Sequence, residues 1–229
     1  RHEDFVDSGP LCAYGDVIRE IDYRVGKLMN TLDSLGLEED TIVIFTSDQG
    51  QRFPFGGKWT CYDLGLKTPF IVRWPGKIKS GTRTKAMTQF VDVIPTLMEA
   101  AGGSPDHVNT GIADTEGCFG FDGTSFLEVM LKKEEEHRDY VYGVHTTRGI
   151  NNGSICYPIR SVRSENFKYI LNLNSSCAFY NNVATAHHMN IYEVCLDKTK
   201  NNPVKHHMVR RYKYRPKEEL YDMRKDPYE

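Results

Sequence analysis

The stretch TIVIFTSDQG, residues 41–50, is an almost unbroken apolar run that ends at a carboxylate, Asp48. Its β-branched residues and the scarcity of polar side chains are typical of a strand covered on both faces by helices. The preceding residues, 11–35, place Leu, Ile and Val at three- and four-residue spacing and predict an amphipathic helix, which Gly36 would end. A helix followed by a buried strand indicates an α/β fold.

Further elements are predicted on both sides of a change in composition near residue 103. Before it, a glycine-rich loop at 56–69 leads into the strand PFIVRWPG, and FVDVIPTLMEAAG predicts a helix over 90–102 with Asp92 as its N-cap and Pro95 in its first turn. After it, residues 103–124 are rich in Gly, Asp and Thr and predict a loop. Antiparallel hairpins are then expected from the runs at 141–146, 156–164 and 167–174.

These elements suggest three parts: an α/β portion at 1–102, a loop-rich connection at 103–139 and an antiparallel subdomain at 140–229. Residues 175–217 are polar and allow no assignment.

Composition excludes several classes of protein. The chain has 229 residues with 29 basic and 31 acidic side chains, a formal charge of -2. Nucleic-acid and membrane-surface partners require a basic field that this balance does not provide. No apolar run approaches the roughly 20 residues of a membrane helix. Six cysteines are too few for a small disulfide scaffold, and sequons at Asn152 and Asn174 are only weak indicators of secretion.

Asp48 is the most informative residue of the sequence. In open α/β sheets, ligands bind at the carboxyl ends of strands, so a carboxylate at this position can hold a hard cation. A loop aspartate that caps a turn is an equally good interpretation of the residue taken alone.

The order of motifs around Asp48 resembles the sulfatase family. IFTSDQG is followed by GGK, by a TPFIV strand with WPG, and by FVDVIPTLMEAAG. The resemblance implies that Asp48 binds the active-site Ca²⁺, that its neighbour Gln49 contributes to the metal site, and that Lys58 contacts the sulfate and its bridging oxygen. Gln49 departs from the Asn or His usual in the family, which leaves its metal role open.

The C-terminal half extends the resemblance. CYPIRSVRSENFKYILNLN followed by ELYDMRKDPYE is similar to the C-terminal subdomain of sulfatases, most of all the heparan N-sulfatase (sulfamidase) branch and its bacterial relatives. An alkaline-phosphatase-like mixed sheet flanked by helices, here incomplete, and a small antiparallel subdomain are therefore implied. His145 and Arg148, in VHTTRGI, would bind an anionic sugar, although a turn of solvated polar residues fits equally well.

Cys156, Pro158 and Arg160 have the C-x-P-x-R spacing of the cysteine that sulfatases oxidise to formylglycine. In the family that cysteine lies upstream of the T-S-D strand, at the start of a long helix, whereas Cys156 follows Asp48 and is predicted to lie in a strand. We therefore expect Cys156 not to be the nucleophile. The chain is then expected to be an internal piece of a larger sulfatase, with the nucleophile and further metal ligands in a missing N-terminal part.

The resemblance predicts a calcium-dependent, formylglycine-type hydrolase of sulfate esters or N-sulfates of a saccharide, in a secreted, periplasmic or lysosomal protein. A phosphoesterase or phosphonate hydrolase of the same superfamily is one alternative, and a non-catalytic carbohydrate-binding protein is another. A zinc site is disfavoured, because its candidate ligands lack the tight spacing of zinc sites: His187, His188, His206, His207, Cys177 and Cys195. A disulfide between Cys177 and Cys195 is the better expectation in an oxidising compartment.

Overall fold

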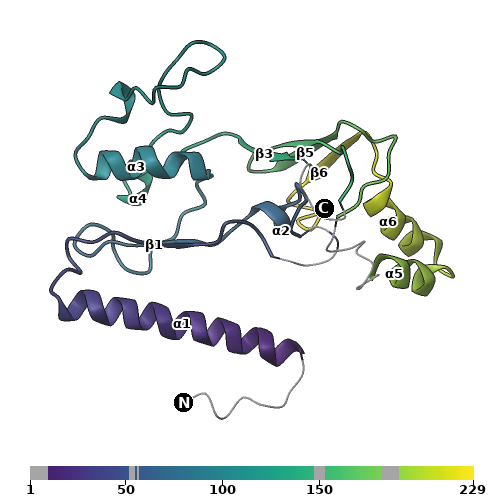
Figure 1. Cartoon of the computed structure of the whole chain (residues 1–229), viewed down its shortest axis with the longest axis horizontal. Coiled ribbons are helices and arrows are strands. Elements are labelled where there is room, and N and C mark those ends of the chain that lie inside the picture. Colours follow the sequence, from purple (N-terminus) through teal and green to yellow (C-terminus); the bar gives the residue numbers. More distant parts are fainter. Residues whose placement is uncertain (1–9, 52–54, 56, 147–152, 182–190) are drawn as a thin grey trace. The chain divides into compact units, whose positions relative to one another are not determined.

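The computed structural model describes residues 10–51, 55, 57–146, 153–181 and 191–229 (Figure 1). The described residues divide into two compact units, one within residues 1–45 and 71–82 and the other within residues 46–70 and 83–229. The three-part division drawn from the sequence remains a prediction.

The first unit confirms the predicted long helix. Helix α1, Pro10–Ser34, ends at Gly36, whose φ of 64° is the left-handed conformation that glycine adopts without strain. The Leu37 N–H donates to the Leu32 carbonyl, and the Gly36 N–H donates to the Asp33 carbonyl, both at 2.9 Å. This pair of bonds satisfies the last carbonyls of the helix.

Strands β1, Val43–Thr46, and β2, Phe70–Arg73, pair in a two-stranded sheet at the predicted positions. The expectation of a strand covered on both faces is wrong for this chain. Phe45 is 39% exposed and Ile71 is 59% exposed. Val17 and Ile18 of α1 are likewise 58% and 50% exposed.

In the second unit, the helix predicted over 90–102 begins with a 3-10 turn. Element η1, Phe90–Asp92, leads into α3, Val93–Ala100, and Gly102 has a φ of 83°. Asp92 occupies the predicted N-cap position directly before α3, but its side chain makes no capping hydrogen bond to that helix. Its carboxylate instead accepts the Gln89 N–H at 2.9 Å, in a capping box that closes the 3-10 turn.

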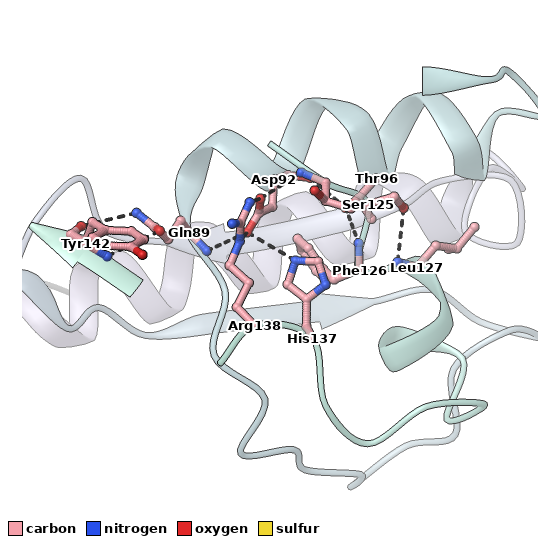
Figure 2. Close-up of polar contacts among 10 residues, drawn as sticks. Gln89, Asp92, Thr96, Ser125, Phe126, Leu127, His137, Arg138 and Tyr142 are labelled. Carbon is pink, nitrogen blue, oxygen red and sulfur yellow. Dashed lines mark hydrogen bonds and ion pairs between the residues drawn. The ribbon is translucent and has the colours of Figure 1, made fainter. Parts of the chain in front are cut away.

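Buried Asp92 connects α3 to the segment that follows it (Figure 2). Its carboxylate accepts hydrogen bonds from the Thr124 N–H at 3.0 Å and from Arg138 through both Nε, at 2.9 Å, and a terminal nitrogen, while His137 Nε2 lies 3.3 Å away. Burial alone would raise the pKa of Asp92, but the bonds from Arg138, Thr124 and Gln89 outweigh it and hold the pKa below its ordinary value. Asp92 is therefore a charged, fully bonded group at the start of α3.

Two short elements lie between α3 and the next sheet: η2, Pro105–His107, and α4, Leu127–Met130. The Thr96 hydroxyl accepts the Phe126 N–H at 3.0 Å, which holds the start of α4 against α3. The Gln89 side chain also reaches the backbone of Tyr142, as Figure 2 shows. Side chains near the start of α3 therefore join this helix both to α4 and to the sheet.

The C-terminal sheet confirms the predicted hairpins. It has the order β3–β4–β5–β6, and all its pairs are antiparallel. Its strands are β3, Val141–His145, β4, Ile159–Arg163, β5, Phe167–Asn172, and β6, Glu218–Asp222. The register pairs Val141 with Arg163 and Phe167 with Asp222. Tyr157, Ile170 and Phe179 are fully buried in the core beside this sheet.

The polar stretch without a sequence assignment contains two helices, α5, Ile191–Thr199, and α6, Pro203–Lys213. Asn202 caps α6, because its side-chain oxygen accepts the Lys205 N–H at 3.1 Å and Pro203 occupies the first turn. Among the described helices, none combines the length and the apolar character needed to cross a bilayer.

Candidate functional site

Asp48 lies two residues beyond β1 with its side chain exposed. Its two oxygens accept from its neighbours, Oδ2 from the Gln49 amide nitrogen at 3.2 Å and Oδ1 from the Ser47 hydroxyl at 3.5 Å. Ser47 also donates to the Gln49 carbonyl at 2.9 Å. The strand end thus presents a carboxylate and an amide side by side, a set of oxygen donors suited to a hard cation.

The backbone after Asp48 packs directly against the short helix α2, Asp63–Leu66. The Gly50 N–H donates to the Gly65 carbonyl at 2.9 Å. A Cβ at Gly50 would lie 2.0 Å from the Leu64 carbonyl oxygen, and one at Gly65 would lie 2.5 Å from the Gly57 carbonyl oxygen. Only glycine fits at both positions, so the two loops are held at a fixed backbone separation.

Lys58 belongs to the second of these loops. Its N–H donates to the Gln51 carbonyl at 2.9 Å, three residues after Asp48. Its ammonium group lies 5.1 Å from the centroid of the Trp59 ring, a cation–π contact. Trp59 has a φ of 64°, a left-handed conformation that is unfavourable for an aromatic residue and turns the chain sharply after Lys58.

A buried ion cluster fixes the start of α2 to the C-terminal sheet. Lys168 of β5 is 1% exposed, and its ammonium lies 2.8 Å from Asp63 Oδ1 and 2.9 Å from Glu229 Oε1. Arg163 Nε lies 3.2 Å from the other oxygen of Asp63, and the Glu229 carboxylate accepts the Asp63 N–H. Each buried charge therefore faces an opposite charge, as its desolvation requires.

A second buried cluster holds the same loop one residue earlier. The Tyr62 hydroxyl donates to Glu219 Oε2 at 3.0 Å, and Asn172 donates to Glu219 Oε1 at 2.8 Å. Burial raises the pKa of Tyr62 well above its ordinary value, so the phenol stays protonated and donates. Arg215, 3% exposed, has its guanidinium 5.0 Å from the Tyr62 ring centroid.

Sequence reasoning did not identify the residues of these two clusters as parts of the site. A charged residue at a core-facing position of a strand is the sequence pattern that could have identified them. Lys168 of β5 and Glu219 of β6 are both buried at such positions, where the alternation of the strand favours an apolar side chain. The side chains that hold Tyr62 and Asp63, after the Lys58 loop, are therefore inward-facing ions of the C-terminal sheet.

His145 lies at the end of β3 and is half-buried, with its ring centroid 6.2 Å from that of Phe179. Burial, and secondarily the charge of Arg215, lower the pKa of His145 to about 4, so its imidazole is neutral at neutral pH. A neutral imidazole can still form a hydrogen bond, and the role of His145 in substrate binding stays a prediction. Arg148 lies outside the described residues.

Known proteins match this chain along most of its length. The family model of sulfatases matches residues 3–104. An ulvan-active sulfatase of Formosa agariphila is 33% identical over 93% of this chain and 36% of its own length. An N-acetylgalactosamine-6-O-sulfatase of Bacteroides thetaiotaomicron is 37% identical over 48% of this chain and 27% of its own length.

The chain matches the sulfatase family over residues 3–104, and it resembles a sulfatase over 93% of its length.

Solved structures are similar to this chain in fold. The structure of a protein in complex with its substrate D-glucosamine-2-N,6-O-disulfate has a TM-score of 0.57 and 22% identity, over 92% of this chain and 33% of its own. The predicted alkaline-phosphatase-like fold is thus confirmed. The chain spans about a third of the length of these relatives.

Two predictions about the cysteines are wrong. Cys156 is exposed and precedes β4, whose pairing starts at Ile159, so its predicted place within a strand is wrong. Cys177 and Cys195 both have free thiols, so the expected disulfide is not formed; Cys177 lies in the turn after β5 and Cys195 within α5. His187 and His188, weighed as zinc ligands, lie outside the described residues.

Proposed function

We propose that the full-length protein is a calcium-dependent sulfatase that hydrolyses sulfate ester or N-sulfate groups of a sulfated saccharide. The observation that supports this most is the pairing of the Asp48 and Lys58 loops, which bond through Lys58 N–H and the Gln51 carbonyl at 2.9 Å. A metal-binding carboxylate and a cation held on two rigid, adjacent loops are the groups that sulfate-ester hydrolysis requires.

The donors around Asp48 fit Ca²⁺ in kind. Ca²⁺ takes about 6 to 8 oxygen ligands, from carboxylates, amide oxygens and water. Asp48 would supply its carboxylate, and Gln49 its Oε1, since its nitrogen donates to Asp48. The described residues contain no group of three or more His, Cys, Asp or Glu that could hold a metal ion. We propose that the remaining ligands come from polypeptide outside these 229 residues.

Each residue then has a defined task. A divalent ion at this position would supply electrostatic stabilisation for the negative sulfate oxygens. Lys58 would donate to the bridging atom as negative charge develops on it, and the Trp59 ring beneath it limits where the ammonium can move. Asp63 and Tyr62, held by buried partners on the C-terminal sheet, keep the loop from shifting.

The nucleophile is proposed to be a formylglycine located outside this chain. Cys156 is a poor candidate, because it lies in a loop before a strand and lacks the N–H donors and favourable dipole of a helix N-terminus.

We infer the substrate class and the location of the protein from its relatives. Two of them are described as an ulvan-active sulfatase and an N-acetylgalactosamine-6-O-sulfatase. We propose a sulfated saccharide for this protein too, in a secreted, periplasmic or lysosomal setting. Because the relatives do not establish whether this protein acts on an O-sulfate or an N-sulfate, the experiment includes a substrate of each kind.

The test is sulfate release by the full-length protein from an aryl sulfate, a 6-O-sulfated N-acetylgalactosamine and an N-sulfated glucosamine, with Ca²⁺ or with a chelator. We expect turnover of at least one substrate with Ca²⁺ and its loss with the chelator. Asp48→Asn should lower kcat/KM about 100-fold or more, since a catalytic metal contributes several kcal/mol.

Asp40→Asn is the matched control, because it makes the same chemical change at an exposed aspartate just before β1 and should leave turnover unchanged. Absence of turnover on all three substrates with Ca²⁺ present would contradict the proposal. Preferential turnover of an aryl phosphate would favour the phosphoesterase alternative.

A further inference from the structure

Helices α5 and α6 lie side by side (Figure 1) and enclose a groove of about 300 Å³. From α6 the groove is lined by His206, Arg210 and Lys213. Their spacing of four and three residues places all three on one face of the helix. Tyr192 of α5 and Tyr214, just after α6, line it as well.

The segment that contains α6 is strongly basic, in contrast to the chain as a whole, while α5 adds one acidic residue, Glu193, to the groove lining. Residues 198–217 contain no Asp or Glu, while the whole chain has a formal charge of -2. The eight cations of the segment are Lys198, Lys200, Lys205, Arg210, Arg211, Lys213, Arg215 and Lys217. Such a concentration of one charge attracts an anionic ligand.

Lys213 is the centre of the groove. Its ammonium lies 4.5 Å from the Tyr180 ring centroid, 5.1 Å from that of Tyr192 and 5.8 Å from that of Tyr214. Its side chain is 13% exposed, and its carboxylate neighbour, Glu193, is 4.0 Å away. That separation is the upper limit for an ion pair and leaves much of the ammonium's hydrogen-bonding capacity for a ligand.

Two further groups of the groove are suited to a ligand. His206 Nδ1 is buried and has no hydrogen-bond partner among the residues that the structure describes, a costly state unless a ligand or water satisfies it. Tyr214 is 53% exposed, so part of its ring is open to an apolar face. The C–H face of a sugar ring is such a surface, while the sugar's sulfates match the cations.

We propose that this α5–α6 groove binds a sulfated saccharide unit, separate from the one whose sulfate is hydrolysed, and so retains a polymeric substrate. Arg210 and Lys213 contact its sulfate, and Tyr214 packs on its ring. This inference rests on the proposed function for its choice of a saccharide as the anion.

The test is a titration of the full-length protein with a heparin hexasaccharide and with its fully desulfated counterpart. Arg210→Gln removes an exposed cation without touching the core and should weaken binding roughly tenfold, the effect of one charge-assisted hydrogen bond. Tyr214→Ala, a second variant outside the core, should weaken it as well. Lys77→Gln removes an equally exposed charge just after β2 and should change nothing.

Equal binding by the wild type, Arg210→Gln and Tyr214→Ala would overturn the proposal. So would equal affinity for the desulfated sugar, or equal competition by a DNA oligonucleotide of matched charge, which would indicate a general polyanion surface. Aryl sulfate turnover separates this inference from the proposed function: both variants should keep it, and its absence in the wild type would contradict the function while leaving the binding result to stand.

Discussion

At the scale of single residues, Asp48 and Lys58 have different surroundings. Asp48 is exposed and contacts only its sequence neighbours Ser47 and Gln49 among the contacts described, so it is open to a cation. Lys58 is half-buried beside Trp59, in a loop fixed by glycine packing and by two buried clusters. A charge fixed in this way needs no reorganisation when negative charge develops next to it.

Lys58→Ala in the full-length protein should therefore lower kcat about 100- to 1,000-fold, the effect of removing one preorganised donor to a developing anion. KM should change little, since the interaction strengthens in the transition state. Steady-state kinetics on an aryl sulfate measures both constants. Lys67→Ala, an exposed lysine directly after α2, is the control and should behave as the wild type; a Lys58→Ala enzyme with unchanged kcat would remove Lys58 from the mechanism.

The sequence predicts functional residues well where the chemistry of the side chain and the local sequence pattern indicate the same role. Asp48 follows a β-branched run, and Lys58 lies in a glycine-rich loop, so both could be proposed from motif and spacing. Lys168, Glu219 and Arg215 could not, because their roles depend on which strands pair and which faces are buried. His145 shows the same limit: its position at a strand end was predicted, but the burial that lowers its pKa to about 4 is a tertiary effect.

At the scale of elements, the periodicity of apolar residues predicts the long helix, β2 and the hairpins. It does not predict elements that are short or mostly polar. α5 and α6 were missed, because their exposed faces are polar and their buried positions few, such as Tyr192 and Tyr212. The 3-10 turn before α3 was not predicted. Asp92 occupies the predicted N-cap position, but its side chain does not cap α3 and is instead the centre of a cluster that joins Gln89, Thr124 and Arg138.

Asp92→Asn should destabilise this region by about 3 kcal/mol, because it leaves the Arg138 guanidinium without its charged partner. The effect depends on pH. An ionised Asp92 with a lowered folded pKa contributes stability above its unfolded pKa of about 3.9, and that stability is lost as the pH falls toward the lower folded value. The variant should therefore lose less stability than the wild type on acidification through this range.

Denaturant unfolding of the full-length protein at neutral and acidic pH measures both effects. Glu135→Gln, an exposed acid just before Arg138, is the matched control and should change the free energy of unfolding by less than about 0.5 kcal/mol. Equal stability of Asp92→Asn and the wild type at neutral pH would show that the cluster contributes nothing to the fold.

At the scale of the whole molecule, the chain spans 36% of an ulvan-active sulfatase to which it is 33% identical. The described residues supply two strands to the first sheet and leave apolar residues of α1 exposed. Asp48 lies among only a few oxygen donors, while Ca²⁺ needs about 6 to 8. A Ca²⁺ site at Asp48 would therefore require further ligands from the full-length protein.

The most direct measurement is a crystal structure of the full-length protein grown with Ca²⁺, with the ion located by its anomalous scattering. We expect a peak about 2.3–2.6 Å from a carboxylate oxygen of Asp48, the ordinary Ca²⁺–oxygen distance, with other carboxylates around it. A catalytically active crystal in which Ca²⁺ lies elsewhere, with no ion in contact with Asp48, would contradict it.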